Sequence, residues 1–394
     1  MRKFISLVFF ALLLTACLVQ PAPVSQPVAP VADTPVVDVP TAVLLVQGTP
    51  VPAEIKAPPI AVPSIFYLDM LNEVDGWAVT ETEIIRTNDG GVTWYVVTPP
   101  TLASAASVST TFLDVNHAWV LVPDANNPLN AGSVYRTQDG GMNWSFNSTP
   151  FGSAQMAFLD ANNGWAMASL GVAAGSNAIS VFQTTDGGVT WTQSFTNDPN
   201  LSNSSESIPL GGLKGLIAPL NLQRAWVGGV VYAPSIVYLY RTDDAGRTWT
   251  QIEVPLPADV NMSEITVDAI KFVSQTDGFM SLRLAGETYR TAFYVTHDAG
   301  DTWSMMSTIL PGTGTTEILA AQEIVFYNGQ QFYVTRDAAQ TWNVVEPDVT
   351  FGDFFATMSF ANASTGWVIM SDLSNNRVLY KSTDGAKTWI QLIP

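Results

Sequence analysis

Short apolar runs alternate with polar turn segments along residues 64–394. In the first part of this region the apolar runs cover residues 65–68, 77–80, 83–87 and 94–97, and Asp, Asn and Gly stand between them. Runs of this length that are bounded by turn-forming residues are typical of β-strands. The pattern therefore predicts four short strands within the first fifty or so residues of this region.

An eight-residue motif, Ser/Thr-x-Asp-x-Gly-x-x-Trp, follows the third apolar run and returns seven times, about every fifty residues. Its aspartates are Asp89, Asp139, Asp186, Asp244, Asp298, Asp337 and Asp384. Its tryptophans are Trp94, Trp144, Trp191, Trp249, Trp303, Trp342 and Trp389. A fixed period of this size indicates one supersecondary unit that is stacked many times.

Each motif lies between two predicted strands, so it is expected to form the turn of a β-hairpin. The Asp side chain can accept hydrogen bonds from backbone N–H groups one to three residues further on. The Gly provides a residue with positive φ without steric cost, and the Trp packs over the turn. Ala339 and Ala386 replace this Gly in the last two copies, whose turns are therefore either strained or differently shaped.

A second phrase, Gly/Ala-Trp followed by apolar residues, precedes most of the motifs. It follows an apolar run that ends in Asp, as in 66–69 before Trp77 and 112–114 before Trp119. Each unit then consists of four strands. Seven such units predict an all-β protein, a seven-bladed β-propeller of four-stranded antiparallel blades over residues 64–394.

The motif resembles the Asp-box, or BNR repeat: all seven copies match at Ser/Thr, Asp and Trp, and five match at Gly. The complete repeat is similar to the photosystem II stability/assembly factor family and its bacterial lipoprotein relatives. That resemblance implies a non-enzymatic propeller that binds other proteins. The same turn occurs in sialidases and xyloglucanases, so a surface glycoside hydrolase of sialidase-like type is the alternative.

The beginning of the chain has the features of an export signal. Arg2 and Lys3 precede an apolar stretch, 4–14, which is too short to span a bilayer, and residues 14–17 (Leu-Thr-Ala-Cys) resemble a bacterial lipobox. This resemblance implies cleavage before Cys17, the one cysteine of the chain, and lipidation of its thiol. We expect a signal peptide at 1–16 and a Pro-rich, lipid-anchored tether at 17–63 in the extracytoplasmic cell envelope. The apolar run 41–47 within this tether is a candidate extra strand at the edge of the last blade.

The formal net charge of −18 becomes −20 when Arg2 and Lys3 leave with the signal peptide. Such an acidic chain repels phosphate backbones, so nucleic acid is not expected as a partner, and the membrane is expected to be contacted through the lipid anchor only. No cofactor, metal or catalytic residue is predicted, because the sialidase-type arginine cluster is not recognisable and His117 and His297 both occupy repeat positions.

The predicted binding surface is the face of the ring opposite the motifs. The longest connections, 123–132, 170–177, 196–213 and 228–235, fall on that face, and a monomer that holds a protein or polysaccharide ligand there is expected. Arg86, Arg136 and Arg241 each stand directly before the Thr of a motif. They are expected either to pair with the neighbouring blade or to form a basic rim that binds an acidic partner.

The lipobox leads to a direct test. Cys17→Ser should release the protein from membranes or leave it unprocessed, because no thiol remains to be acylated. Membrane fractionation and incorporation of a labelled fatty acid measure this. Unchanged membrane binding of the variant, together with no label on the wild type, would contradict the lipoprotein prediction.

Overall fold

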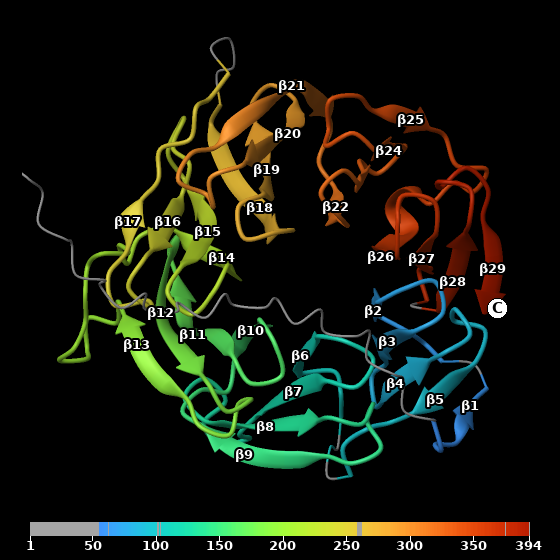
Figure 1. The fold of residues 1–394 in the computed structure, drawn as a ribbon, viewed down its shortest axis with the longest axis horizontal. Helices are drawn as coiled ribbons and strands as arrows, with labels where there is room; N and C mark the ends of the chain where they lie inside the picture. The colour runs from blue at the N-terminus through green and yellow to red at the C-terminus, as the bar shows by residue number, and fades with distance from the viewer. Residues whose placement is uncertain are drawn as a thin grey trace, which may run out of the picture. The chain divides into compact units, whose positions relative to one another are not determined.

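The computed structural model describes residues 55–61, 63–100, 102, 104–257, 262–374 and 376–393, so Cys17 and residues 41–47 lie outside the described residues. The described residues belong to one compact unit, which consists of β-strands and one short 3₁₀ helix, η1 (Gly352–Phe354). In these residues no helix is long and apolar enough to cross a membrane. Figure 1 shows the sheets arranged around a central opening, which makes the chain an all-β β-propeller.

Five of the sheets have the size of a single blade, and every strand pair within them is antiparallel. The first sheet contains β1 (Pro59–Ile60), β2 (Tyr67–Met70), β3 (Gly76–Val79), β4 (Ile84–Thr87) and β5 (Trp94–Val96). The second contains β6 (Ser109–Phe112), β7 (Ala118–Pro123), β8 (Gly132–Thr137) and β9 (Ser145–Thr149). The third contains β10 (Ala154–Phe158), β11 (Gly164–Ala173), β12 (Ser176–Thr184) and β13 (Thr192–Thr196). The last two contain β22 (Thr315–Ile318), β23 (Ile324–Tyr327), β24 (Phe332–Thr335) and β25 (Asn343–Val345), and β26 (Phe355–Phe360), β27 (Gly366–Ser371), β28 (Arg377–Ser382) and β29 (Ile390–Ile393).

The remaining sheet has eight strands, because β15 pairs with β18. It contains β14 (Leu213–Pro219), β15 (Ala225–Val231), β16 (Leu239–Thr242), β17 (Thr250–Gln251), β18 (Glu264–Phe272), β19 (Gly278–Ala285), β20 (Tyr289–Thr296) and β21 (Ser304–Pro311). The prediction of seven separate four-stranded blades is therefore wrong: the hydrogen bonds define five blade-sized sheets and this larger one. Gly228 permits the close approach, because a Cβ there would lie 2.8 Å from the side chain of Val267 in β18.

The short strand β1 extends the first sheet at its outer edge. Pro59 and Ile60 lie opposite Tyr95 and Trp94 of β5, and the Val96 amide donates to the Pro58 carbonyl at 3.0 Å. A proline is tolerated there because an edge strand does not need every N–H group. The sheet thus begins before residue 64, within the segment expected to be tether, and β1 covers an edge that would otherwise be open.

The repeated motif forms the same turn in all seven copies. The Ser/Thr hydroxyl donates to the Asp carboxylate at 2.8–3.0 Å and accepts the amide four residues further on at 2.8–3.1 Å. The carboxylate also accepts the amide of the fourth residue after it at 2.8–2.9 Å, one position beyond the expected range. The two residues after each Asp have φ between 58° and 89°. Ala339 (φ 62°) and Ala386 (φ 71°) adopt this conformation as well, so their turns keep the shape and bear the strain of a left-handed alanine.

Each turn is also tied to its own sheet, and indole hydrogen bonds join several sheets to their neighbours. The amide directly after the Asp donates to the connection between the first two strands of the same repeat at 2.7–3.1 Å in every copy. The Trp77 indole donates to the Asp114 carbonyl of the next sheet at 3.0 Å, and Trp119 reaches the Gly187 carbonyl in the same way at 2.8 Å. Trp367 donates to the Gly90 carbonyl at 2.9 Å and so joins the last sheet to the first. Ring closure therefore uses the same kind of indole contact as the junctions at Trp77 and Trp119, together with apolar packing.

The turn geometry predicts how much each aspartate stabilises the ring. Asp139→Ala removes an acceptor for the Thr137 hydroxyl and the Asn143 amide, and we expect a loss of about 1–3 kcal/mol in the free energy of unfolding. Asp337→Ala should cost a similar amount, because Asp337 accepts the corresponding bonds from Thr335 and Thr341 despite the strained Ala339. Denaturant melts of both variants measure this, and a negligible loss at either position would show that the carboxylate does not stabilise the turn.

Candidate functional site

The two faces of the ring differ in their construction. We call the face that carries the seven motif turns the motif face, and the opposite face the loop face. On the loop face, connections between sheets bond to the turn between the second and third strands of a repeat, as in Ala105 to Glu81, Gly152 to Leu129 and Gly212 to Gly175. The long connections that the sequence analysis singled out therefore lie on the loop face.

Exposed apolar side chains are concentrated on the loop face. Among the described residues, Val74 and Val92 are the exposed large apolar side chains in the turns of the motif face, and three more stand on outer strands within two residues of a motif Trp: Phe146, Val344 and Ile390. On the loop face they belong to the connections of several sheets: Leu129, Val172, Leu201, Leu210, Tyr232, Ile236, Tyr289, Phe354 and Leu373. This unequal distribution distinguishes the loop face from the motif face.

A buried lysine fixes part of the loop face. The Lys214 ammonium donates to the carbonyls of Asn177, Leu210 and Gly212 at 2.8–3.0 Å, and it lies 5.5 Å from the Tyr238 ring centre. Burial lowers the pKa of Lys214 to about 8. These contacts hold the 196–213 connection against the β11–β12 hairpin, so this part of the surface is formed in advance of any partner.

Two of the three arginines before the motifs bond to the next repeat, and the third lies beside an aspartate of its own repeat. Arg136 donates to the Asp186 carbonyl of the next sheet at 2.7 Å, and Arg241 donates to the Asp301 carboxylate of the next repeat at 2.7 Å. Arg86 is fully buried, with its guanidinium 3.6 Å from the Asp75 carboxylate and 5.5 Å from the Trp77 ring centre. Burial lowers the pKa of Arg86, and Asp75 partly offsets this effect. Arg86 is therefore inaccessible to a partner, and pairing with neighbouring elements, not a basic rim, describes what all three side chains do.

The histidines and the motif aspartates have partners within their own repeats. His117 Nδ1 lies 2.9 Å from Asp114, and His297 Nδ1 lies 2.7 Å from Asp277. In the described residues no group of three His, Cys, Asp or Glu side chains is placed to hold a metal ion. Burial raises the pKa values of most of the motif aspartates, but their hydrogen bonds outweigh it, so the pKa is lowered in all seven copies.

The innermost strands carry charged residues that sequence reasoning missed. Asp69 on β2, Lys271 on β18 and Glu317 on β22 occupy equivalent positions, each paired in register with the position of the Gly-Trp tryptophan. Burial raises the pKa of Asp69 to about 6, and Lys271 partly offsets this. Burial, and then the Asp69 carboxylate, raise the pKa of Glu317 to about 8, again partly offset by Lys271. Their equivalent positions place all three on inner strands of the ring, in three different repeats.

The sequence analysis aligned Asp69 with Asp114, and the structure corrects this. Asn72 is the counterpart of Asp114, because its side-chain oxygen accepts the Val74 and Asp75 amides just as Asp114 accepts those of Asn116 and His117. The available signal was spacing: Asn72 and Asp114 both stand five residues before the Trp of the second phrase, whereas Asp69 stands eight before it.

A cavity of about 720 Å³ opens beside Asp69. Its walls come from the inner strands β2, β6 and β10, and Figure 1 shows these strands along the central opening. Tyr67, Thr111 and Gln155 contribute polar groups, and Phe66 and Phe112 contribute apolar surface. Burial raises the pKa of Tyr67, as do the Asp69 and Glu317 carboxylates, so its phenol stays neutral and can donate a hydrogen bond.

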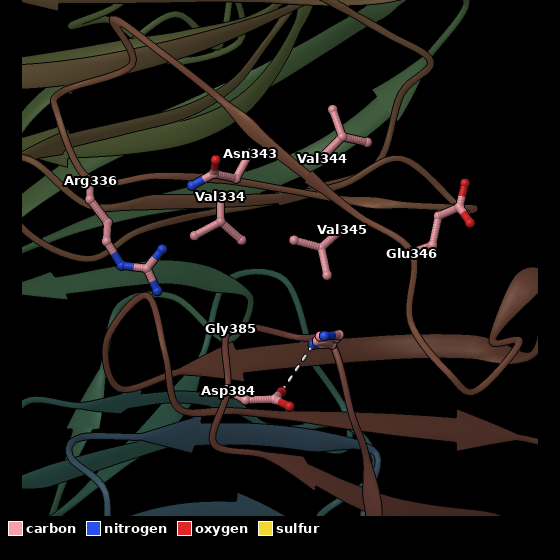
Figure 2. A pocket seen from close by; sticks show the side chains of 9 residues that line it. Val334, Arg336, Asn343, Val344, Val345, Glu346, Asp384 and Gly385 are labelled. Carbon is pink, nitrogen blue, oxygen red and sulfur yellow. Dashed lines mark hydrogen bonds between the residues drawn. The ribbon is translucent and has the colours of Figure 1, made fainter.

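A second pocket, of about 360 Å³, lies between β25 and the motif turn of the last sheet. Figure 2 shows Arg336 and Asp384 on opposite sides of it, and the dashed line marks the bond from the Lys387 amide to Asp384. Arg336 donates to the Ala363 carbonyl at 2.7 Å and to the Ser364 hydroxyl at 3.1 Å. The Arg336 guanidinium and the Asp384 carboxylate already bond to the junction between sheets and to the turn, so we regard this pocket as a structural groove.

Comparison with known proteins relates the chain to propellers of different activities. No protein-family model and no curated protein matches the sequence. Among solved structures, YCF48 bound to a D1 peptide is 15% identical, with a TM-score of 0.50 over 85% of this chain and 99% of that one. The GH74 xyloglucanase from Xanthomonas campestris is 13% identical, with a TM-score of 0.54 over 85% of this chain and 55% of that one. An ancestral GH74 enzyme is 12% identical, with a TM-score of 0.50 over 88% and 48%.

These likenesses show the propeller fold. The chain spans about half the length of the GH74 enzymes that it matches.

The raised pKa of Glu317 predicts a pH-dependent effect of its neutral analogue. A glutamate in the unfolded chain has a pKa of about 4.3, whereas the pKa of Glu317 in the folded protein is about 8, so the folded protein binds the Glu317 proton more tightly. The free energy of unfolding of the wild type therefore falls as pH rises between these two values. Glu317→Gln should therefore stabilise the protein more at pH 9 than at pH 5. Melting temperatures at the two pH values measure this, with Glu346→Gln on the ring exterior as the control. A difference from wild type that does not change with pH would contradict the inferred ionisation.

Proposed function

We propose that this protein is a non-enzymatic scaffold that binds a polypeptide through the loop face of its propeller, held at the outer surface of a bacterial membrane by a lipid on Cys17. The observation that carries the proposal is the unequal distribution of exposed apolar side chains between the two faces. We count seven repeats in the ring, two of which share the eight-stranded sheet. The shape that this chain shares with YCF48, a propeller seen with a peptide bound, supports a polypeptide as the ligand.

The loop face suits a polypeptide in its chemistry as well. Tyr232 and Tyr289 offer aromatic bodies with polar ends, which are enriched in protein interfaces. Tyr232 lies against Gly175 of the neighbouring sheet, where a Cβ would come within 3.3 Å of the tyrosine ring. A surface that joins several sheets in this way can contact an extended chain along its length.

The second candidate is a glycoside hydrolase, and the carboxyl groups of Asp69 and Glu317 on the inner strands are the observation that favours it. Two carboxyl groups with different pKa values can act as general acid and as base or nucleophile. The GH74 likeness agrees with such an activity. Release of reducing ends from xyloglucan and other polysaccharides tests it: activity that disappears in Glu317→Gln would favour the hydrolase over the scaffold.

Position-specific cross-linking tests the scaffold. A photoreactive amino acid at position 232 should form adducts with an envelope polypeptide, whereas the same group at position 92 should not. The two positions form a matched pair, since Tyr232 is 64% exposed on the loop face and Val92 is 66% exposed on the motif face. Equal adducts from both positions, or adducts from position 92 alone, would refute the assignment of the binding face.

A further inference from the structure

The exposed apolar side chains of the loop face are not spread evenly around the ring. Five of the nine that the described residues place on this face stand in three neighbouring connections of the third and fourth repeats, 170–177, 196–213 and 228–236. We call these five side chains the apolar sector: Val172, Leu201, Leu210, Tyr232 and Ile236. Figure 1 shows the strands next to these connections, β11, β12, β14 and β15, close to one another.

Printed contacts between the three connections hold the apolar sector together. The Gly212 amide donates to the Gly175 carbonyl at 3.0 Å, and a Cβ at Gly175 would come within 3.3 Å of the Tyr232 ring. The Lys214 ammonium bonds to carbonyls of two of the connections. The backbone of the sector is therefore fixed before a partner binds, which reduces the ordering that binding requires.

Two of the connections also carry backbone strain. In the part of the chain that the structure describes, Ala174 (φ 47°) and Ser235 (φ 57°) are the residues other than glycine that have a positive φ outside the motif turns. This conformation is unfavourable for a residue with a Cβ. Neither residue belongs to the repeated motif, and each stands within two positions of an exposed member of the sector, Val172 or Ile236. Strain of this kind is concentrated at binding surfaces, where it holds neighbouring side chains in one orientation.

A pocket of about 280 Å³ opens beside Ile236. Much of its lining is apolar, including Val237, Ile252 and Leu256, and the exposed Glu253 lies in the same wall. An apolar side chain from a partner that enters this pocket would remove the lining from water, which favours binding. A cationic group next to that side chain would then meet the Glu253 carboxylate.

The charge of the apolar sector favours a basic partner. The three connections contain Asp198 and Glu206 but no Lys or Arg. Lys214, which directly follows the second connection, is only 7% exposed because its ammonium group turns inward to backbone carbonyls. A second copy of this chain is a poor match, because its formal net charge of −18 would be repelled.

We propose that the apolar sector binds a polypeptide segment in which apolar residues are interspersed with lysine or arginine. This proposal rests on the proposed function, because it assigns a place on the loop face and a charge to the polypeptide held there. One apolar side chain of the segment enters the pocket beside Ile236, and others cover Tyr232 and Val172. The cationic side chains of the segment lie near Glu253 and Glu206.

Model peptides added to the whole protein test this chemistry without an identified partner. A fluorescent eight-residue peptide of alternating leucine and lysine should bind saturably in an anisotropy titration. Peptides of alternating leucine and glutamate, or serine and lysine, should bind about tenfold more weakly or worse. Thermal melts verify that the protein and its variants are folded.

A matched pair of variants tests the location. Ile236→Ser should weaken binding of the leucine–lysine peptide about tenfold, whereas Phe354→Ser should leave it unchanged. The two residues are comparable, because each is 41% exposed on the loop face and they belong to different repeats. Glu253→Gln should weaken the same peptide about threefold, as expected for an exposed ion pair.

The outcomes separate this proposal from the scaffold function. No saturable binding of the leucine–lysine peptide, equal binding of the leucine–glutamate or serine–lysine peptide, or equal losses from Ile236→Ser and Phe354→Ser would overturn the proposal. Self-association of the protein that Ile236→Ser abolishes would assign the apolar sector to a second copy instead. Cross-links from position 232 but not from position 92, together with failed peptide titrations, would leave the scaffold intact and remove only the basic, apolar partner.

Discussion

The pair of left-handed residues after each motif Asp is the conformation on which the rest of the ring depends. Two consecutive residues with positive φ are unfavourable for any residue except glycine, and the turn persists because one hydroxyl and one carboxylate satisfy the amides that it exposes. That turn directs the following amide toward its own sheet, and in two copies it presents a carbonyl to the preceding sheet. Gly90 and Gly187 each accept the indole of a tryptophan from the preceding sheet, so local turn chemistry becomes the contact that joins sheets.

Where this geometry is purely local, the sequence was sufficient to predict it. The Asp positions are fixed by hydrogen bonds within eight residues, so the pattern identified all seven turns, including those at Ala339 and Ala386. It could not predict that β15 and β18 share a sheet, because this depends on strands that run past the ends of the repeat and on the small Gly228 beside Val267. It also did not predict β1, since two residues beside prolines carry no strand pattern of their own.

The candidate site was less predictable for a related reason. The loop face followed from connection lengths, because the meander assigns each connection to one face. Glu317 and Lys271, however, are single polar residues on otherwise ordinary strands, and their equivalent positions depend on the pairing of whole strands. Asp69 was assigned to a turn because its spacing from Trp77 was not compared with that of Asp114. Spacing to the nearest fixed residue is therefore a better guide to register than similarity of the local string.

The shared sheet makes the repeats unequal as mechanical elements. Elsewhere, apart from the single bridge between Ser176 and Gly212, the sheets meet mainly through side chains, so a small rotation of one against the next stretches indole bonds and apolar contacts but breaks no extended backbone ladder. Between the fourth and fifth repeats, backbone pairing from Val230 and Val231 to Thr266 and Ile265 crosses the boundary. This junction is a rigid arc in an otherwise segmented ring. Any opening motion of the ring must therefore occur at the other junctions, including the one between the last and first sheets.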